Sequence, residues 1–352
     1  TTRKNFSRKI RFTTYVAYGT KDKEFKGHAK VNYAISNEPE RRLEFNFKQD
    51  NALLGASSDD ILTEGSMMKS MLAKNNGSGD RRSLVRKFSA SYLNEWSPNV
   101  LQAYSITSRK IFANVNLPMM TSEGEAVPAI NDNQIHVGTR FCWKEDVARG
   151  VFSNQHLYTK YPVVILDLGG SFKTPGKWSY QYLRPELSVT WKKMTPPLGY
   201  SRMMFNTGTI IGQVPYPLLK LHEGNSSYIY ERSAFSCMNH YEFASDTWAS
   251  FFFEHNFGGF FLGKIPLLNK TKMREVFTFK ATYGSLSEKN GTKPLFIMPE
   301  GMSSLGGVPY VETGVGIANI LRFIRVDTFW RLTHRREDMR NFAVNVGFEV
   351  MF

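Results

Sequence analysis

Hydrophobic and polar residues alternate one by one along most of this chain. Every even position from Phe342 to Phe352 is apolar, whereas the positions between them are mostly small or polar. Because neighbouring side chains of a β-strand point to opposite faces, each such stretch predicts a strand with one apolar and one polar face. Fourteen strands are predicted in this way, over 10–18, 25–35, 43–48, 83–96, 99–112, 135–144, 161–172, 178–193, 200–213, 239–257, 274–285, 309–319, 322–334 and 341–352.

The connections between the predicted strands fall into two sets that alternate along the chain. One set is mostly short and comprises 36–40, 97–98, 195–199, 265–273 and 319–321, with 145–160 as a long member. The other set is longer and comprises 51–82, 113–133, 214–238 and 286–308. Outer-membrane barrels have short periplasmic turns and longer loops on the outside. The pattern therefore predicts an all-β fold, a transmembrane antiparallel β-barrel over 1–352, with both ends of the chain on the periplasmic side.

Other architectures fit the sequence less well. It contains no repeat of blade length, as a propeller requires, and no run of about 18 apolar residues, as a membrane helix requires. A soluble β-sandwich is a rival, but Trp and Tyr near so many predicted strand ends favour a membrane barrel. A bilayer cannot hydrogen-bond to an open sheet edge, so we expect the barrel to close.

The amino-acid composition indicates which classes of binding partner suit the chain. The formal net charge is +14, and 14% of the residues are aromatic. Nucleic-acid binding gathers basic residues on one face or one helix, whereas here Lys and Arg are spread over nearly every predicted strand. The sequence therefore indicates no nucleic-acid partner. Basic loops are suited instead to the phosphates of outer-membrane lipid and lipopolysaccharide.

The sequence contains histidine, serine and carboxylate residues, but it does not place them in the arrangement that a catalytic site requires. Glu254 and His255 are adjacent, so they point to opposite strand faces and cannot act together. A barrel hydrolase would need a serine within hydrogen-bond reach of a histidine. No metal-ligand spacing is found, so the sequence predicts no catalytic residue, no metal site and no cofactor. Cys142 and Cys237 are compatible with two thiols or with one disulfide.

The run from Gly314 to Leu332 resembles the penultimate hairpin of the barrel-assembly and translocation-assembly (surface antigen) superfamily of outer-membrane proteins. In that hairpin, a strand with a Gly-x-Gly element turns into a strand with Arg, an apolar residue and Asp. The matching residues here are Gly314, Gly316, Arg325, Val326 and Asp327. The end of the chain also resembles the C-terminal strand signal that the assembly machinery recognises, and the signal residues would be Phe348, Val350 and Phe352.

A closer resemblance is to a Bacteroidota outer-membrane family in which a carboxypeptidase-regulatory-like domain precedes an uncharacterised barrel. It covers nearly the whole chain and is most specific in 208–235, 238–270 and 309–320. This resemblance implies two further barrel strands before residue 1, and therefore sixteen strands in the full protein. It also implies a location in the bacterial outer membrane.

In the superfamily, the long loop before the twelfth strand folds into the lumen and carries a short Arg-Gly-aromatic motif. The corresponding segment here is 214–238, which the resemblance makes the candidate lumen loop. Its Arg232 is followed by Ser233 and Ala234 instead of Gly and an aromatic residue. The departure leaves the locking contact of the motif without its usual residues.

Charged residues on the predicted inward faces form a candidate lumen network. Mixed charges inside a barrel usually brace the wall and hold a loop, although such pairs stabilise less than their number suggests. We expect Arg232 to pair with Glu242 or Asp327. The candidate residues are Arg232, Glu242, Asp246, Glu254, Lys280, Glu312, Arg325, Asp327, Arg331 and Glu349.

The resemblance implies a role in moving or inserting proteins or lipids, together with protein partners in an envelope complex. Two alternatives stay open at this point. One is a structural or partner-binding barrel whose lumen is plugged, and the other is a barrel hydrolase acting on lipid or peptide. The sequence itself identifies neither a cargo nor a partner.

Overall fold

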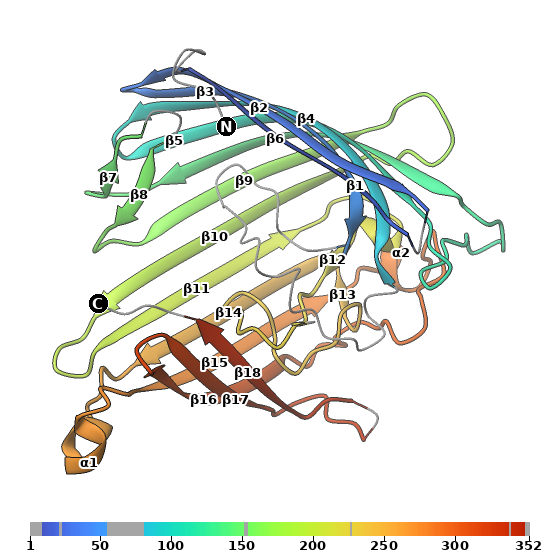
Figure 1. The fold of residues 1–352 in the computed structure, drawn as a ribbon. Coiled ribbons are helices and arrows are strands. Elements are labelled where there is room, and N and C mark those ends of the chain that lie inside the picture. Colours follow the sequence, from blue (N-terminus) through green and yellow to red (C-terminus); the bar gives the residue numbers. More distant parts are fainter. Residues whose placement is uncertain are drawn as a thin grey trace.

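One large antiparallel sheet of fourteen strands dominates the molecule (Figure 1). The computed structural model describes residues 9–20, 23–54, 81–150, 154–225, 227–337 and 339–348. Within them, the strands of the large sheet follow one another in the sheet in the same order as in the chain. The strands are β1 (Ile10–Tyr18), β2 (Phe25–Asn37), β3 (Glu40–Ala52), β4 (Ser83–Ser97), β5 (Val100–Phe112), β6 (Ala129–Phe141), β9 (Val163–Phe172), β10 (Tyr182–Met194), β11 (Tyr200–Thr209), β14 (Thr247–Asn256), β15 (Arg274–Ser285), β16 (Tyr310–Ile320), β17 (Ile324–Arg331) and β18 (Phe342–Phe348).

Smaller elements lie in the connections. In the described residues, two small two-stranded sheets stand apart from the large sheet, and four short helical turns lie between strands. The small sheets are β7 (Asp146–Ala148) with β8 (Gln155–Tyr158), and β12 (Lys220–Leu221) with β13 (Ala244–Ser245). The helical turns are η3 (Tyr216–Leu218), η4 (Leu262–Lys264), α1 (Pro266–Asn269) and α2 (Glu288–Gly291). In the described ranges, no helix is long and apolar enough to cross a membrane.

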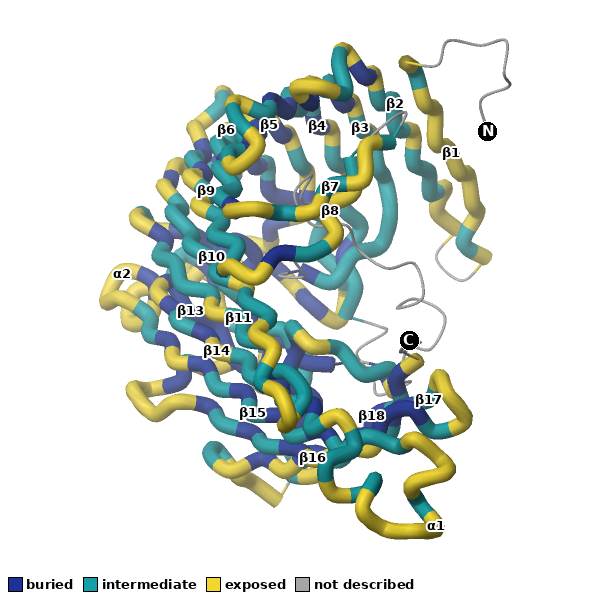
Figure 2. The backbone as a smooth tube through the Cα atoms, turned by 90° about the vertical axis from the view of Figure 1, so that its left-hand side faces the viewer, coloured by how far each residue is buried: buried dark blue, intermediate teal, exposed yellow. Residues whose placement is uncertain are grey.

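The sheet is strongly curled, and its strands run around a central space (Figures 1 and 2). Its two edge strands are β1 and β18. No ladder joins β1 to β18 within the described residues. The fourteen-strand antiparallel all-β fold predicted from the alternation is thus confirmed, whereas the expected closure of the barrel is not seen in this part of the chain.

The two faces of the curled sheet differ in chemistry. On β4 and β5 the outward side chains of Phe88 and Ile106 are 53% and 58% exposed, whereas their inward neighbours Ser89 and Thr107 are 8% and 7% exposed. The register places outward residues of successive strands side by side, so that Ile106 lies opposite Ile135 of β6. The outward face is therefore largely apolar and exposed, whereas the inward face is covered and combines polar side chains with apolar clusters.

The largest apolar cluster lies on the concave side of the sheet, where segment 210–246 meets the longer connections. It includes inward residues of β5, β6 and β14, such as Ile130 and Trp248, and residues of the connections, such as Leu117 and Phe296. The Tyr216 hydroxyl donates hydrogen bonds of 3.3 Å to main-chain oxygens of the 113–128 connection. This end of the central space is therefore filled by packed side chains from several connections.

Several predicted strand boundaries were wrong, two of them by six residues or more. The alternation predicts one strand over 239–257, but β14 begins at Thr247 because the chain turns at Tyr241, whose φ is +62°, and the Asn239 N–H bonds to the Glu242 carboxylate. The structure also begins β6 at Ala129 instead of 135, since 129–134 continue the ladder with β5. Residues 349–352, which include Glu349, Val350 and Phe352, lie outside the described residues.

The Gly-x-Gly element of β16 has a steric explanation. A Cβ atom at Gly314 would lie 2.5 Å from the ring of the buried Phe329 of β17. A Cβ atom at Gly316 would collide with the carboxylate of Asp327. Both glycines face inward, and each leaves room for a large inward side chain of the next strand.

We expect Gly316→Ala to lower the free energy of unfolding by about 2 kcal/mol, because the added methyl group must displace a tightly bonded carboxylate. The measurement is thermal unfolding of the purified chain in detergent, followed by circular dichroism. Gly263→Ala is the matched control, since a Cβ atom there meets nothing within 4 Å. Equal melting temperatures for the two variants would contradict the steric explanation.

Candidate functional site

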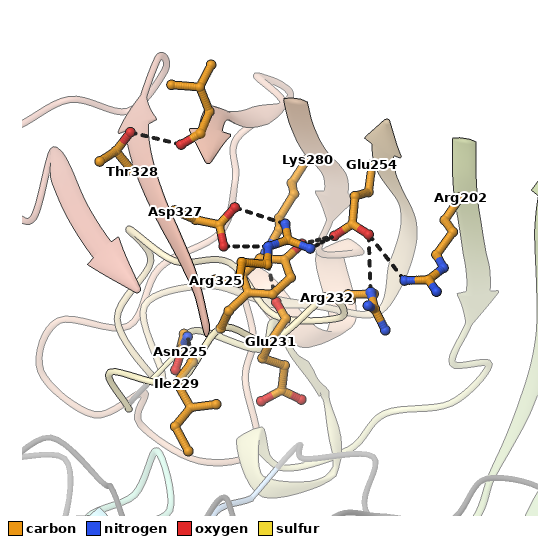
Figure 3. A network of polar contacts seen from close by, with 12 residues as sticks. Arg202, Asn225, Ile229, Glu231, Arg232, Glu254, Lys280, Arg325, Asp327 and Thr328 are labelled. Atoms are coloured by element: carbon orange, nitrogen blue, oxygen red, sulfur yellow. Dashed lines mark hydrogen bonds and ion pairs between the residues drawn. The ribbon is translucent and has the colours of Figure 1, made fainter. Parts of the chain in front are cut away.

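The candidate site is the contact between the connection 210–246, here called the inner loop, and the inward side chains of β14 to β18. The inner loop leaves β11 at residue 210 and reaches β14 at residue 247. Many of its residues are buried, including Phe235 and Cys237. Figure 3 shows how charged side chains from the strands converge on its central part.

Lys280 and Glu312 hold the main chain of the inner loop. They lie opposite each other on β15 and β16, both are fully buried, and Nζ is 4.0 Å from the carboxylate. Lys280 donates hydrogen bonds to the carbonyl oxygens of Glu231 and Ala234, at 2.9 and 2.5 Å. The Glu312 carboxylate accepts hydrogen bonds from the next main-chain N–H groups, those of 236 and 237, at 2.7 and 2.9 Å. The cation thus binds carbonyl groups and the anion binds amide groups.

Arg325 and Glu254 form the centre of a second cluster (Figure 3). The Arg325 guanidinium donates two hydrogen bonds to Asp327, at 2.7 and 2.9 Å, and a third of 2.7 Å to Glu254. It also lies 4.1 Å from the ring centre of Tyr230 on the inner loop. The Tyr230 hydroxyl donates a hydrogen bond of 2.9 Å to Glu254. These contacts satisfy a buried guanidinium and at the same time fix one loop side chain.

Two more cations approach Glu254 from the other side. Arg202 of β11 lies 3.4 Å from its carboxylate, and Arg232 of the inner loop lies 3.3 Å from it. Arg232 is the outermost member, since its side chain is 47% exposed. One carboxylate therefore joins β11, β14, β17 and the inner loop.

The ends of the inner loop are held separately. Near its C-terminal end, Glu242 accepts a hydrogen bond of 2.6 Å from Arg331 of β17. Asp246 accepts hydrogen bonds from the main chain and side chain of Ser287, at 2.8 and 2.5 Å, and from Asn290 at 2.9 Å. Asp246 thereby ties the loop to the connection that contains α2 and does not contact the arginine cluster.

The inner loop also pairs with the edge of β18. The N–H of Tyr230 bonds to the carbonyl of Val346 at 2.8 Å, and the N–H of Val346 bonds to the carbonyl of Tyr228 at 2.7 Å. Asn345 donates a further hydrogen bond to the carbonyl of Ser227. Part of the outer edge of the last described strand is therefore occupied by a segment of the loop.

The structure brings most of the candidate network residues together, but in combinations that the sequence did not predict. Arg232 is expected to meet Glu242 or Asp327, and it meets Glu254 instead. Glu242 is bonded to Arg331, and Asp327 is bonded to Arg325. Glu349 lies outside the described residues.

Two participants were missed by the sequence analysis. Arg202 faces inward directly opposite Glu254, which an assignment of strand pairs would have revealed. Tyr230 follows Tyr228 and Ile229, and nothing in the sequence distinguishes it from Tyr228. The contact of Arg202 with Glu254 depends on the strand register, and the contact of Tyr230 with Arg325 depends on the path of the loop.

Serine–histidine contacts exist, but without an acid. Ser245 lies 2.9 Å from the ring of His222, and Ser201 lies 2.8 Å from the ring of His255. Among the described residues, no carboxylate contacts either ring. Burial, together with the charge of Lys220, lowers the pKa of His222 to about 3, so this histidine is neutral at ordinary pH. The arrangement therefore lacks the acid that orients the histidine in a Ser-His-Asp triad.

The cysteines and possible metal ligands give no further site within the described ranges. Cys142 and Cys237 are both free thiols and both buried. Burial and the nearby Glu312 carboxylate raise the pKa of Cys237 to about 12, which keeps the thiol protonated and unreactive. Over the same residues, no group of three or more His, Cys, Asp or Glu side chains is arranged to hold a metal ion.

The all-β fold, a curled antiparallel sheet of fourteen strands in the described residues, has a counterpart among solved structures. The chain is similar to the crystal structure of BamA from Haemophilus ducreyi lacking POTRA domains 1–3, with a TM-score of 0.53 and 9% sequence identity. The likeness covers 92% of this chain and 62% of the BamA chain, so this chain spans less than two thirds of that protein. At this identity the likeness is one of fold.

The sequence places the chain in a family. Residues 104–289 match the C-terminal domain of a family of unknown function, DUF5686. This match covers more than half of the chain, which therefore belongs to that family. No curated protein matches the chain.

We expect Lys280→Met and Glu312→Gln each to lower the free energy of unfolding by about 3 kcal/mol, because each leaves the other charge buried without its partner. The double variant should lose less than the sum, with a coupling of about 1–3 kcal/mol. Denaturant unfolding in detergent measures all three variants.

Arg232→Gln serves as the control for this cycle. Its side chain is about half exposed, so its pair with Glu254 should contribute less than about 1 kcal/mol. Strictly additive effects of Lys280→Met and Glu312→Gln would show that the two charges hold the loop independently.

Proposed function

We propose that the chain is an integral β-barrel of the bacterial outer membrane that takes part in the assembly or translocation of envelope proteins or lipids. The observation that carries the membrane location is the exposed apolar outer face of the curled sheet. Large hydrophobic residues on that face are far more exposed than an aqueous surface of this extent favours. Lipid is the solvent that suits such a face, while the polar inner face suits water and the inner loop.

The assembly role is supported by the BamA-like fold and by the way the inner loop meets the last strand. Backbone groups at a sheet edge attract further strands. Here the inner loop, held by Lys280, Glu312 and Arg325, engages the edge of β18 through Val346. An element that contacts both the wall and the edge is placed to influence how the first and last strands of the barrel meet. The role we propose is not enzymatic.

Several finer features belong to the same proposal. They are protein partners in an envelope complex, contact with lipopolysaccharide, and recognition of the C-terminal strand through Phe348, Val350 and Phe352. Two further strands before residue 1 would complete a sixteen-strand barrel that follows a carboxypeptidase-regulatory-like domain, as in the Bacteroidota family. The similarity in fold to BamA and the match to a C-terminal domain agree with this arrangement.

A structural or partner-binding barrel with a plugged lumen is the second candidate. The apolar cluster that joins Leu117, Tyr216, Trp248 and Phe296 favours it, since packed side chains fill one end of the central space. In that case the protein would serve a complex as a rigid subunit. The two candidates differ in what happens to other barrel proteins when this one is removed.

The membrane location is tested by single cysteines in a Cys142→Ala/Cys237→Ala background, each labelled with an environment-sensitive fluorophore. Val315→Cys lies on the outer face of β16, where Val315 is 51% exposed. Val115→Cys lies in the 113–128 connection, where Val115 is 94% exposed. In vesicles, brominated lipid should quench the label at 315 and leave the label at 115 bright. Equal quenching at both positions, or at neither, would falsify the proposed location.

The assembly role is tested by depletion of the protein in its native host, followed by quantitative proteomics of the outer membrane. We expect many other outer-membrane barrels to decrease while periplasmic proteins keep their abundance. Restoring the unmodified gene is the control. A depleted strain with normal barrel levels that loses only the proteins co-purifying with this chain would favour the structural candidate instead.

A further inference from the structure

Two cations lie directly opposite each other on the outer face of the sheet. The register pairs Arg86 of β4 with Lys110 of β5, and it continues the same row with Gln49 on β3 and Asn131 on β6. Arg86 and Lys110 are both exposed. Their outward direction follows from Arg109, the neighbour of Lys110, which faces inward to the buried Asp132.

This pairing is electrostatically unfavourable by itself. Like charges directly opposite on neighbouring strands are destabilising. Both cations lie over the ring of Phe112, at 5.9 Å for Arg86 and 5.3 Å for Lys110, but a ring does not neutralise two charges. The Nε of Arg86 donates a hydrogen bond of 2.9 Å to Gln49. In the described ranges of the chain, no carboxylate forms an ion pair with either cation.

The inward neighbour shows the contrast. Arg109 has a carboxylate 2.5 Å from its Nε, supplied by Asp132 on the adjacent strand. The outward pair has only neutral amides beside it in its row. An anion from outside the chain is therefore the natural counter-charge for Arg86 and Lys110.

The position of the row identifies the anion. One pleat closer to the middle of the same strands stand Phe47 and Phe88, which are 42% and 53% exposed on the outer face. The row Gln49–Arg86–Lys110–Asn131 therefore lies near the border of the apolar face, on the side of the longer connections, with Leu84 and Phe112 one pleat beyond it on β4 and β5. In a membrane, that border is the level of the lipid headgroups. A guanidinium beside an ammonium is well suited to phosphate, through directed hydrogen bonds from one and a compact charge from the other.

We propose that Arg86 and Lys110 bind the headgroup phosphate of a membrane lipid in the leaflet next to the longer connections. Gln49 and Asn131 flank the phosphate and offer amide groups to the sugar or glycerol that carries it. This proposal rests on the proposed membrane location and gives the contact with outer-membrane lipid a specific place. Phosphorylated glycolipids such as lipid A are the chemical class that fits two adjacent cations best, because their phosphate monoesters carry more charge than a diester.

The test uses the full chain in a neutral detergent and a fluorescent bisphosphorylated lipid A, with binding followed by fluorescence anisotropy. We expect Arg86→Gln/Lys110→Gln to weaken binding at least about tenfold, the loss that follows from removing one or two charge-assisted hydrogen bonds. Arg41→Gln/Lys193→Gln is the matched control. It removes the same charge from the outer face at the opposite strand ends, where the register places these residues near the short turns.

Two competitors identify the source of the phosphate. Unlabelled lipid A should displace the probe, whereas its dephosphorylated form and inorganic phosphate should not at matched concentrations. Equal binding by wild type and the Arg86/Lys110 variant, an equal loss in the Arg41/Lys193 control, or displacement by dephosphorylated lipid A would overturn the proposal. Displacement by inorganic phosphate at the same concentration would show a site for free phosphate and would overturn it as well.

Membrane insertion is measured separately, by quenching of the label at position 315 in each variant. If the Arg86/Lys110 variant inserts normally and binds lipid A as tightly as the wild type, the proposed lipid site is refuted and the proposed membrane location is unaffected. Failure of quenching at 315 in the wild type removes the membrane location itself. The two results are therefore distinguishable.

Discussion

The charge buried on the inner face of β14 to β18 is the constraint on which this half of the molecule depends. A lysine, two glutamates, an aspartate and two arginines are enclosed there almost completely. Taking an ion out of water costs several kcal/mol, so each of these groups requires partners with good geometry. The inner loop supplies many of them, and in return its path is fixed. Wall and loop are thus stable together, and neither arrangement would be favourable without the other.

The outer face of the sheet is subject to a different constraint, because its apolar side chains are exposed instead of buried. Its side chains are mostly apolar in the middle of the strands, and the charged ones described above stand near the strand ends. The same backbone ladder separates the two environments, because successive residues of each strand alternate between them. The glycines of β16 show how closely the strands must match on the inner side, where a single methyl group at Gly316 would meet the carboxylate that holds Arg325.

The sequence was sufficient for the strands because their signal is local. Alternation over ten or so residues identified all fourteen strands of the large sheet, and it failed mainly where a strand met a long connection, as at 239–246. The inner-loop contacts were harder to predict from the sequence, since they join residues that are far apart in the chain. Which carboxylate Arg232 meets depends on the register of β11 and β14 and on the path of the loop between them. The pairing of Arg86 with Lys110 likewise became visible only when β4 and β5 were aligned.

The hydrogen bonds from Lys280 and Glu312 to the inner loop have a consequence for how the loop sequence can vary within the family. Lys280 binds main-chain carbonyl groups at 231 and 234, which every amino acid has, and Glu312 binds main-chain N–H groups at 236 and 237, which every amino acid except proline has. A mutation at one of these loop positions, other than to proline, changes the side chain but keeps the main-chain atoms that Lys280 and Glu312 bind. The side chains of such a loop can therefore change during evolution without loss of its attachment. The residues whose identity matters for this attachment are Lys280 and Glu312 on the strands. Because Lys280 binds the main-chain carbonyl of Ala234, this contact sets no requirement on the side chains that follow Arg232.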